Sequence, residues 1–187
     1  MDFITKDWLI LPGGSDINPE IYGKKNYKSY VSDYSKQRDA KEIEEYRKAV
    51  SEGRPILGIC RGHQLISALN GLTLIQDMSH GMEHYIQVRN LETDEFDRRI
   101  KVNDAHHQLV YTNNELEGEN FKVYGYCKLS KHHLYQEDEE VQVEIEPEII
   151  HFPKINALGV QFHPEWMVRG SYNKTLSYLE QLVNKLF

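Results

Sequence analysis

Short apolar runs alternate with amphipathic stretches along the first third of the chain. Trp8–Leu11 is an apolar run that ends at Pro12, and Pro55–Ile59 is a nearly continuous one, so both are predicted to be buried strands. Between them, apolar residues at helical spacing predict a helix from Asp39, its N-cap, to about Glu52. A second helix follows the second strand directly. This order predicts an α/β fold, with a mostly parallel sheet flanked by helices.

The rest of the chain is predicted to form short strands and one long helix. Strands are expected at 72–76, 85–88, 99–102, 148–152 and 158–162, the last two as a hairpin. The polar segment Tyr22–Lys36 is interpreted as a surface loop. Apolar and polar residues alternate within the acidic segment Gln136–Glu148, which indicates a strand with a solvated acidic face. Ser171–Phe187 carries a clear apolar stripe and is predicted to be a helix.

Composition limits the class of protein. The chain has 187 residues, 22 Lys and Arg and 29 Asp and Glu, with a net charge of −7, and we expect a single domain over residues 1–187. The acidic balance argues against a nucleic-acid partner. Neither an apolar run of ~20 residues nor an N-terminal secretory pattern is visible, so we expect no membrane contact. Two cysteines in unrelated contexts indicate a reducing, cytoplasmic location.

Cys60 stands where the second predicted strand ends and a helix begins. Gly58 and Gly62 flank it at the spacing of a nucleophile elbow, a sharp turn that needs small neighbours. Such a turn places the sulfur at the carboxyl end of the strand and at a helix N-terminus, which favours the thiolate. It also exposes the backbone N–H of Arg61 as an oxyanion donor. Cys127 has no such setting and is interpreted as a packing residue.

His163 is the candidate base for this nucleophile. It directly follows the predicted strand at 158–162, and Glu165 lies two residues beyond it, across a proline. A carboxylate in that position can hold the imidazole tautomer. The sequence therefore predicts a Cys60–His163–Glu165 triad.

Four stretches of the chain carry a resemblance to a known family. The first is Leu11–Pro19 with Tyr22 and Gly23, and the second is Arg38, Asp39 and Glu42 together with Pro55–Gln64. The third is Val102–Gln108, which is the weaker match, and the fourth is Gly159–Trp166. Through them the chain resembles the class I glutamine amidotransferases. Within that family it is most similar to the gamma-glutamyl hydrolase branch, which includes the gamma-glutamyl-GABA hydrolases. Asp104 departs from the pattern, because relatives usually carry serine there.

The resemblance implies a flavodoxin-like fold and a cofactor-free hydrolysis of a gamma-glutamyl amide through a thioester on Cys60. It implies that a glycine N–H of the first loop completes the oxyanion hole with Arg61; by position this is Gly14, with Gly13 as the second choice. Gln64 is expected to touch the glutamyl group. His106 is expected either at the pocket edge or as a hydrogen-bonded structural residue.

The resemblance also sets an expectation for the N-terminus. Family members usually begin with a strand and a helix before the strand that leads into Pro12, and about one βαβ unit, roughly 30 residues, is missing here by comparison. We expect the strand edge left without that unit to be covered in a homodimer.

Three classes of function remain open at this stage. The first is a stand-alone hydrolase of small gamma-glutamyl amides, and the second is a glutaminase subunit that supplies ammonia to a synthetase partner. The third is a non-enzymatic binding protein on the same scaffold. A zinc site was also considered, from the pairs His80 and His84, His106 and His107, and His132 and His133. These pairs do not form a cluster at ligand spacing, so no metal is predicted.

Overall fold

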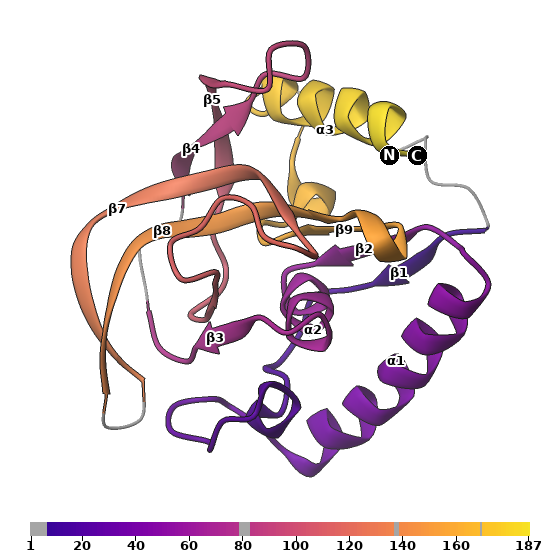
Figure 1. The fold of residues 1–187 in the computed structure, drawn as a ribbon, viewed down its shortest axis with the longest axis vertical. Coiled ribbons are helices and arrows are strands. Elements are labelled where there is room, and N and C mark those ends of the chain that lie inside the picture. Colours follow the sequence, from indigo (N-terminus) through magenta and orange to yellow (C-terminus); the bar gives the residue numbers. More distant parts are fainter. Residues whose placement is uncertain (1–6, 79–82, 137–138, 169) are drawn as a thin grey trace.

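A seven-stranded mixed sheet forms the centre of the molecule, and helices pack against both of its faces (Figure 1). The computed structural model describes residues 7–78, 83–136, 139–168 and 170–187. The sheet strands are, in spatial order, β1 (Leu9–Leu11), β2 (Ile56–Ile59), β9 (Ala157–Val160), β8 (Glu139–Phe152), β7 (Lys122–Gln136), β4 (Glu83–Arg89) and β5 (Phe96–Asn103). A separate pair joins β3 (Thr73–Ile75) to β6 (Leu109–Tyr111). The helices are α1 (Asp33–Ser51), α2 (Arg61–Leu69) and α3 (Asn173–Leu186).

The prediction of an α/β fold with flanking helices is confirmed, but fewer strand pairs are parallel than expected. Strands β1, β2 and β9 are parallel neighbours, whereas the four remaining pairs of the sheet are antiparallel. The predicted hairpin at residues 148–162 is present as β8–β9, with Phe152 opposite Ala157. Short connections such as this one force adjacent strands to run in opposite directions, which explains the mixed sheet.

Both faces of the central strands are buried, as the continuous apolar run in β2 indicates. Ile56 packs in a cluster with residues of α1 and α2, whereas the next residue, Leu57, packs in the cluster that contains Leu179 and Leu182 of α3. Alternate residues of a strand point to opposite faces, so α1 and α2 cover one face and α3 covers the other. Among the described residues, no helix has the length and apolar character needed to cross a membrane.

Helix α1 begins seven residues earlier than predicted. Ser32 is its N-cap and forms a capping box with Ser35, so Asp39 lies inside the helix and is not its cap. The first turns of α1 are mostly polar and show no apolar periodicity before Ile43. They are held by buried polar contacts, which a pattern of apolar residues does not reveal. The surface loop predicted at Tyr22–Lys36 therefore ends earlier than expected, before Asp33.

A long ribbon of β7 and β8 extends beyond the rest of the sheet (Figure 1). β7 was not predicted. On β8, Gln142 and Glu144 are exposed, as expected for a solvated acidic face. Glu146 and Glu148 continue the same face but are fully buried, so the expectation is wrong for these two residues. The reason is that this part of β8 lies next to the loop that carries His106, 3.7 Å from Glu146.

Candidate active site

Three neighbouring parallel strands end at one edge of the sheet, and the predicted triad lies there. Gly13 and Gly14 follow β1, Cys60 follows β2, and His163 follows β9. In parallel sheets such an edge is where ligands bind. A cavity of about 370 Å³ opens at this point. Its lining residues are Pro12, Gly13, Gly14, Cys60, Ala105, His163, Glu165 and Trp166.

The backbone at Cys60 has the strained geometry of a nucleophile elbow. Its φ is 50° and its ψ is −104°, a conformation that costs energy for a residue with a side chain. A Cβ on Gly62 would lie 2.0 Å from the carbonyl oxygen of Leu11, and one on Gly58 would lie 2.5 Å from the backbone of Gly62. Close backbone packing therefore requires both glycines. The turn is fastened to β9 by the Cys60 N–H, which donates to the carbonyl of Val160 at 2.8 Å.

The environment of the Cys60 sulfur favours the thiol over the thiolate. Burial raises the pKa of Cys60 to about 12, and the negative charges of Glu165, Asp16 and Glu148 act in the same direction. The backbone N–H of Arg61 hydrogen-bonds to the sulfur and opposes this rise. The sequence led us to expect a thiolate, because it indicated the helix N-terminus but not the burial. In this structure the desolvation of the sulfur outweighs the helix terminus.

His163 is oriented by contacts on several sides. Its Nδ1 lies 2.7 Å from Oε1 of Glu165, so Nδ1 carries the proton in the neutral ring and Nε2 is the basic nitrogen. Its ring stacks on Trp166 with 3.7 Å between centroids and an angle of 2° between planes. Gly13 lies against the ring, where a Cβ would come within 2.6 Å of Cε1. These contacts leave the imidazole little freedom to rotate.

Asn103, at the end of β5, is a positioning residue that the sequence did not reveal. Its side chain accepts a hydrogen bond from the His163 N–H at 2.8 Å and donates to the His163 carbonyl at 2.9 Å. The two bonds tie the backbone of His163 to the end of β5, the edge strand on the other side of the sheet from β1. The available signal was the asparagine in the stretch Val102–Gln108, but nothing in the sequence connects it to His163.

The Arg61 side chain is fully buried and paired with two carboxylates of α1. Its guanidinium donates to Asp39 and to Glu42, whose side chains are also nearly inaccessible to solvent. Asp39 accepts a further bond from the Asn18 N–H at 2.9 Å. Burial raises the pKa of Asp39, although this hydrogen bond and the charge of Arg61 oppose the rise. These contacts thus join Arg61, the residue that directly follows Cys60, to α1.

Arg38 extends this network to the loop after β1. It binds Glu42 at 2.7 Å through Nε and donates from Nη2 to the carbonyls of Pro12 and Gly13 at 3.0 and 3.1 Å. Its Nη1 also occupies the space beside Gly14, where a Cβ would lie 2.1 Å away. The sequence singled out Arg38, Asp39 and Glu42 only through the resemblance. The structure shows that they support the glycine loop that lines the cavity.

Both predicted substrate-binding residues, Gln64 and His106, lie outside the lining of this cavity. The Gln64 amide is buried and donates to the Gln108 carbonyl at 3.2 Å and to Gln161 at 3.3 Å. His106 is buried too, with Nδ1 2.9 Å from the Gln108 carbonyl and Nε2 3.2 Å from Asp104. This placement agrees with the second expectation for His106, that of a hydrogen-bonded structural residue. Only its neighbour Ala105, within the described part of that loop, reaches the cavity.

His106 and His107, which are adjacent in the sequence, contact different partners. His107 turns to Asp16, with Nε2 2.9 Å from its carboxylate, and so ties the loop after β1 to this segment. His63 is fully buried on α2, where desolvation lowers its pKa to about 3, which keeps the ring neutral. His80 lies outside the described residues.

We predict that Arg61→Met lowers the free energy of unfolding by ~3–5 kcal/mol, because it leaves two buried carboxylates without their cation. Arg98→Met is the matched control. Arg98 is largely exposed and lies 3.7 Å from Asp97, and such surface pairs contribute at most ~1 kcal/mol. Urea unfolding of both variants measures the difference. Equal losses in the two would contradict a supporting role of Arg61.

We also predict that iodoacetamide alkylates Cys60 slowly at neutral pH when no substrate is present. The rate should rise about tenfold per pH unit without a plateau up to pH 10, because the thiolate fraction rises in that way below a raised pKa. Peptide mapping by mass spectrometry follows the reaction, with glutathione as a reference thiol. A plateau at or below neutral pH would instead indicate a preformed thiolate.

Comparisons with known proteins agree with this architecture. The chain is 30% identical over 120 residues to the "Putative glutamine amidotransferase-like protein YvdE homolog" of Lactococcus lactis subsp. cremoris, which covers 56% of this chain and 63% of that protein. Across the first such curated relatives, the chain spans between about a third and two thirds of their length.

Solved structures show the same fold at low sequence identity. A "putative gmp synthase subunit a protein" of Thermoplasma acidophilum matches with a TM-score of 0.54 at 15% identity, over 96% of this chain and 72% of that one. A glutamine amidotransferase of Thermotoga maritima matches with a TM-score of 0.52 at 16% identity, over 86% and 62% of the two chains. The family described as Peptidase C26 matches residues 3–165, and the chain therefore belongs to the Peptidase C26 family of glutamine amidotransferase-like proteins.

Proposed function

We propose that this chain is a cysteine-dependent hydrolase of gamma-glutamyl amide bonds, with Cys60, His163 and Glu165 as its catalytic triad. One observation carries the proposal. A cysteine at a strained elbow and a histidine bound to a carboxylate line the same cavity, at the ends of adjacent parallel strands. A nucleophile, a base and a group that orients the base are the parts that acyl transfer requires.

In the first half of the reaction the sulfur replaces the amine on the substrate carbonyl. Nε2 of His163 takes the proton of the Cys60 thiol as Sγ forms a bond to the gamma-carbonyl carbon. The carbonyl oxygen becomes an oxyanion, which the backbone N–H groups of Arg61 and Gly14 stabilise. The carbon–nitrogen bond then breaks, and the leaving nitrogen takes the proton from His163. The products of this half are a gamma-glutamyl thioester on Cys60 and a free amine or ammonia.

In the second half water regenerates the enzyme. His163 takes a proton from water as the water oxygen bonds to the thioester carbon. Collapse of the second oxyanion breaks the carbon–sulfur bond, and the proton on His163 returns to Cys60. Glutamate leaves. Because Cys60 rests as a buried thiol, the imidazolium forms only during each attack, and Glu165 stabilises it at that moment.

The cavity supports a small amide substrate with an apolar leaving group. Its volume of about 370 Å³ lies at the lower end of small-molecule sites. Trp166 lines it and is 60% exposed, so part of its indole is open to a ligand or a partner. The loop Leu11–Pro19 resembles the gamma-glutamyl hydrolase branch. We therefore place the substrate among gamma-glutamyl amines, with glutamine as a weaker substrate.

A second candidate function is a glutaminase subunit that passes ammonia to a synthetase partner. The triad and its chemistry are the same. Two observations favour it. Trp166, which lines the cavity, and Val168, two residues further along the chain, both have exposed apolar side chains, and the Thermoplasma protein of the same fold is described as a GMP synthase subunit. The two functions differ in whether the isolated chain turns over substrate.

We predict that the isolated chain releases glutamate from a panel of gamma-glutamyl amines and, more slowly, from glutamine. Each small apolar group of the amine that contacts the cavity should contribute ~1–3 kcal/mol to the difference in kcat/KM. Glutamate release measured with glutamate dehydrogenase tests this. Cys60→Ser should remain folded and lose almost all activity.

Two outcomes would count against the proposal in different ways. Folded protein that is labelled at Cys60 by a glutamine-mimicking electrophile, yet hydrolyses no member of the panel, would favour the partner-dependent glutaminase. Folded protein that neither reacts at Cys60 nor cleaves any member would exclude both enzymatic functions.

We predict that Glu165→Gln lowers kcat by ~10²–10⁴ with a smaller effect on KM. The substitution keeps the shape of the side chain but removes the charge that stabilises the His163 cation, and the corresponding change in a Ser-His-Asp triad costs ~10⁴. Steady-state kinetics on the best substrate of the panel measure the loss. Glu180→Gln on the exposed side of α3 is the control and should retain wild-type rates. Wild-type kcat in Glu165→Gln would show that the carboxylate takes no part.

A further inference from the structure

A second group of chemically competent side chains lies away from the cavity, on three adjacent strands. His84 belongs to β4, Cys127 to β7 and Glu146 to β8. β7 lies between the other two strands in the sheet. Cys127 and Glu146 are direct partners in the β7–β8 register, so their side chains project from the same face. None of the three lines the candidate active site.

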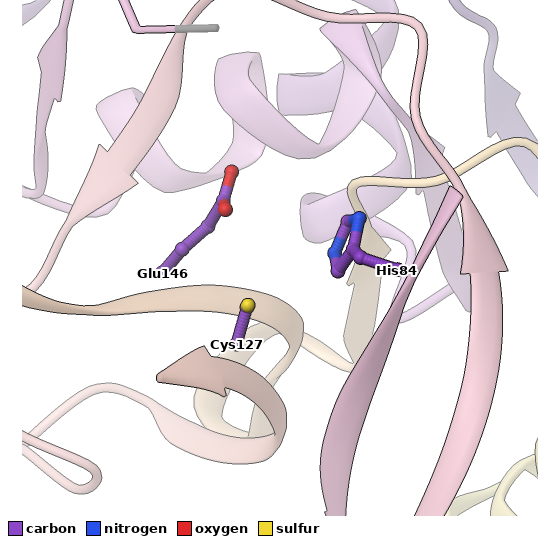
Figure 2. A group of neighbouring side chains, drawn as sticks. All are labelled: His84, Cys127 and Glu146. Atoms are coloured by element: carbon purple, nitrogen blue, oxygen red, sulfur yellow. The ribbon is translucent and has the colours of Figure 1, made fainter. Parts of the chain in front are cut away.

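The three side chains are close enough to share one ion. One ligand atom from each lies within 4.8 Å of the others, and Figure 2 shows them as neighbours that project from separate strands. A tetrahedral zinc ion with bonds of ~2.0–2.3 Å separates its ligand atoms by ~3.3–3.8 Å. A contraction of about an ångström, within reach of side-chain torsions, would therefore complete the site.

The surroundings of His84 match the outer shell of a metal site. Its Nε2 lies 2.7 Å from Oε1 of Glu148, which is fully buried. Metal-binding histidines commonly hold a carboxylate with one nitrogen and the ion with the other. With Nε2 held by Glu148, Nδ1 of His84 is the nitrogen that we assign to the metal. Glu148 lies two residues from Glu146 on the same face of β8, so one strand supplies both carboxylates.

The local balance of charge also favours a cation. Three buried carboxylates meet here, from Asp104, Glu146 and Glu148. Among the described residues, the groups of opposite charge that face them include His84 and His106, which are cationic only when protonated, and Arg99, which lies near Cys127. A divalent ion would neutralise this cluster without requiring both histidines to be protonated.

We propose that His84, Cys127 and Glu146 bind a zinc ion, with Glu148 holding His84 from the outer shell and a water molecule in the fourth position. A mixed set of nitrogen, sulfur and oxygen ligands suits zinc, whereas magnesium and calcium prefer oxygen alone. On binding, Cys127 gives up its thiol proton to solvent and coordinates as the thiolate. No alternation or spacing in the sequence reveals this site, because each ligand comes from a different strand.

The proposed ion would hold three strands in register at an irregular part of the sheet. The β7–β8 pairing shifts between Gly125 and Tyr126, directly before Cys127. A metal that joins β4, β7 and β8 at this point would fix the relative positions of the strands. The role we infer is therefore structural, and none of the three proposed ligands takes part in the chemistry proposed for Cys60.

Cobalt substitution tests the proposal without reference to activity. The full chain, stripped with a chelator and reloaded with Co²⁺, should bind one ion per chain and show a sulfur-to-cobalt absorption band in the near ultraviolet. Cys127→Ser should lose the band, and Glu146→Gln should weaken cobalt binding at least tenfold. Cys60→Ser, which removes the other cysteine of the chain, should keep the band. Absence of a band in the wild-type chain, or a band that disappears with Cys60 and persists without Cys127, would overturn the site.

A measurement on the wild-type chain keeps the test decisive if Cys127→Ser does not fold. The chain is treated with N-ethylmaleimide at pH 8, with and without one equivalent of Zn²⁺, and the labelled peptides are mapped. Zinc should protect Cys127 at least tenfold and the chelator should restore its labelling. Thermal unfolding followed by circular dichroism should show a higher Tm for the zinc-loaded chain. Equal labelling of Cys127 in both samples would contradict the proposal.

Discussion

The edge of the sheet that carries the candidate active site depends on the buried contact between Arg61 and two carboxylates of α1. Arg61 follows Cys60 in the chain, so a shift of its guanidinium would move the elbow itself. Asp39 and Glu42 lie three residues apart on α1 and present a single face to it. Buried ion pairs contribute little net stability, because both charges lose their hydration. The main effect of this ion pair is to fix the positions of α1, α2 and the loop after β1 relative to one another.

The same network explains why the glycine loop is held beside the nucleophile. Glu42 binds both Arg61 and Arg38, and Arg38 in turn holds the carbonyls of Pro12 and Gly13. Two positive and two negative side chains thus share a nearly dry space with their charges balanced. A loop rich in glycine has many accessible conformations. Anchoring its carbonyls reduces that freedom in the part of the loop that lines the cavity.

Burial keeps the Cys60 thiol protonated, and the close contacts around His163 fix the orientation of its ring. The dry surroundings of Cys60 keep its thiol protonated, so the proposed reaction would depend on a histidine that is already oriented. Glu165, Trp166 and the side chain of Asn103 supply that orientation from three directions. The polar cluster on β4, β7 and β8 follows a similar rule. There too, buried charges persist because strands from distant parts of the chain bring opposite charges together.

Local sequence determined much of the fold and the positions of the candidate nucleophile and base. Apolar runs predicted β1, β2, the β8–β9 hairpin and α3, since burial on a fixed face imposes a repeating pattern. The glycines around Cys60 predicted the elbow, because the need for a small residue there is a local steric constraint. Only the tertiary structure decided which polar residues are buried. Asp39, Glu146 and Glu148 look like cap or surface residues in the sequence, and Asn103, Arg38 and His84 carry no local signal. Their roles come from partners tens of residues away, and pairing at that distance is set by how strands and helices pack.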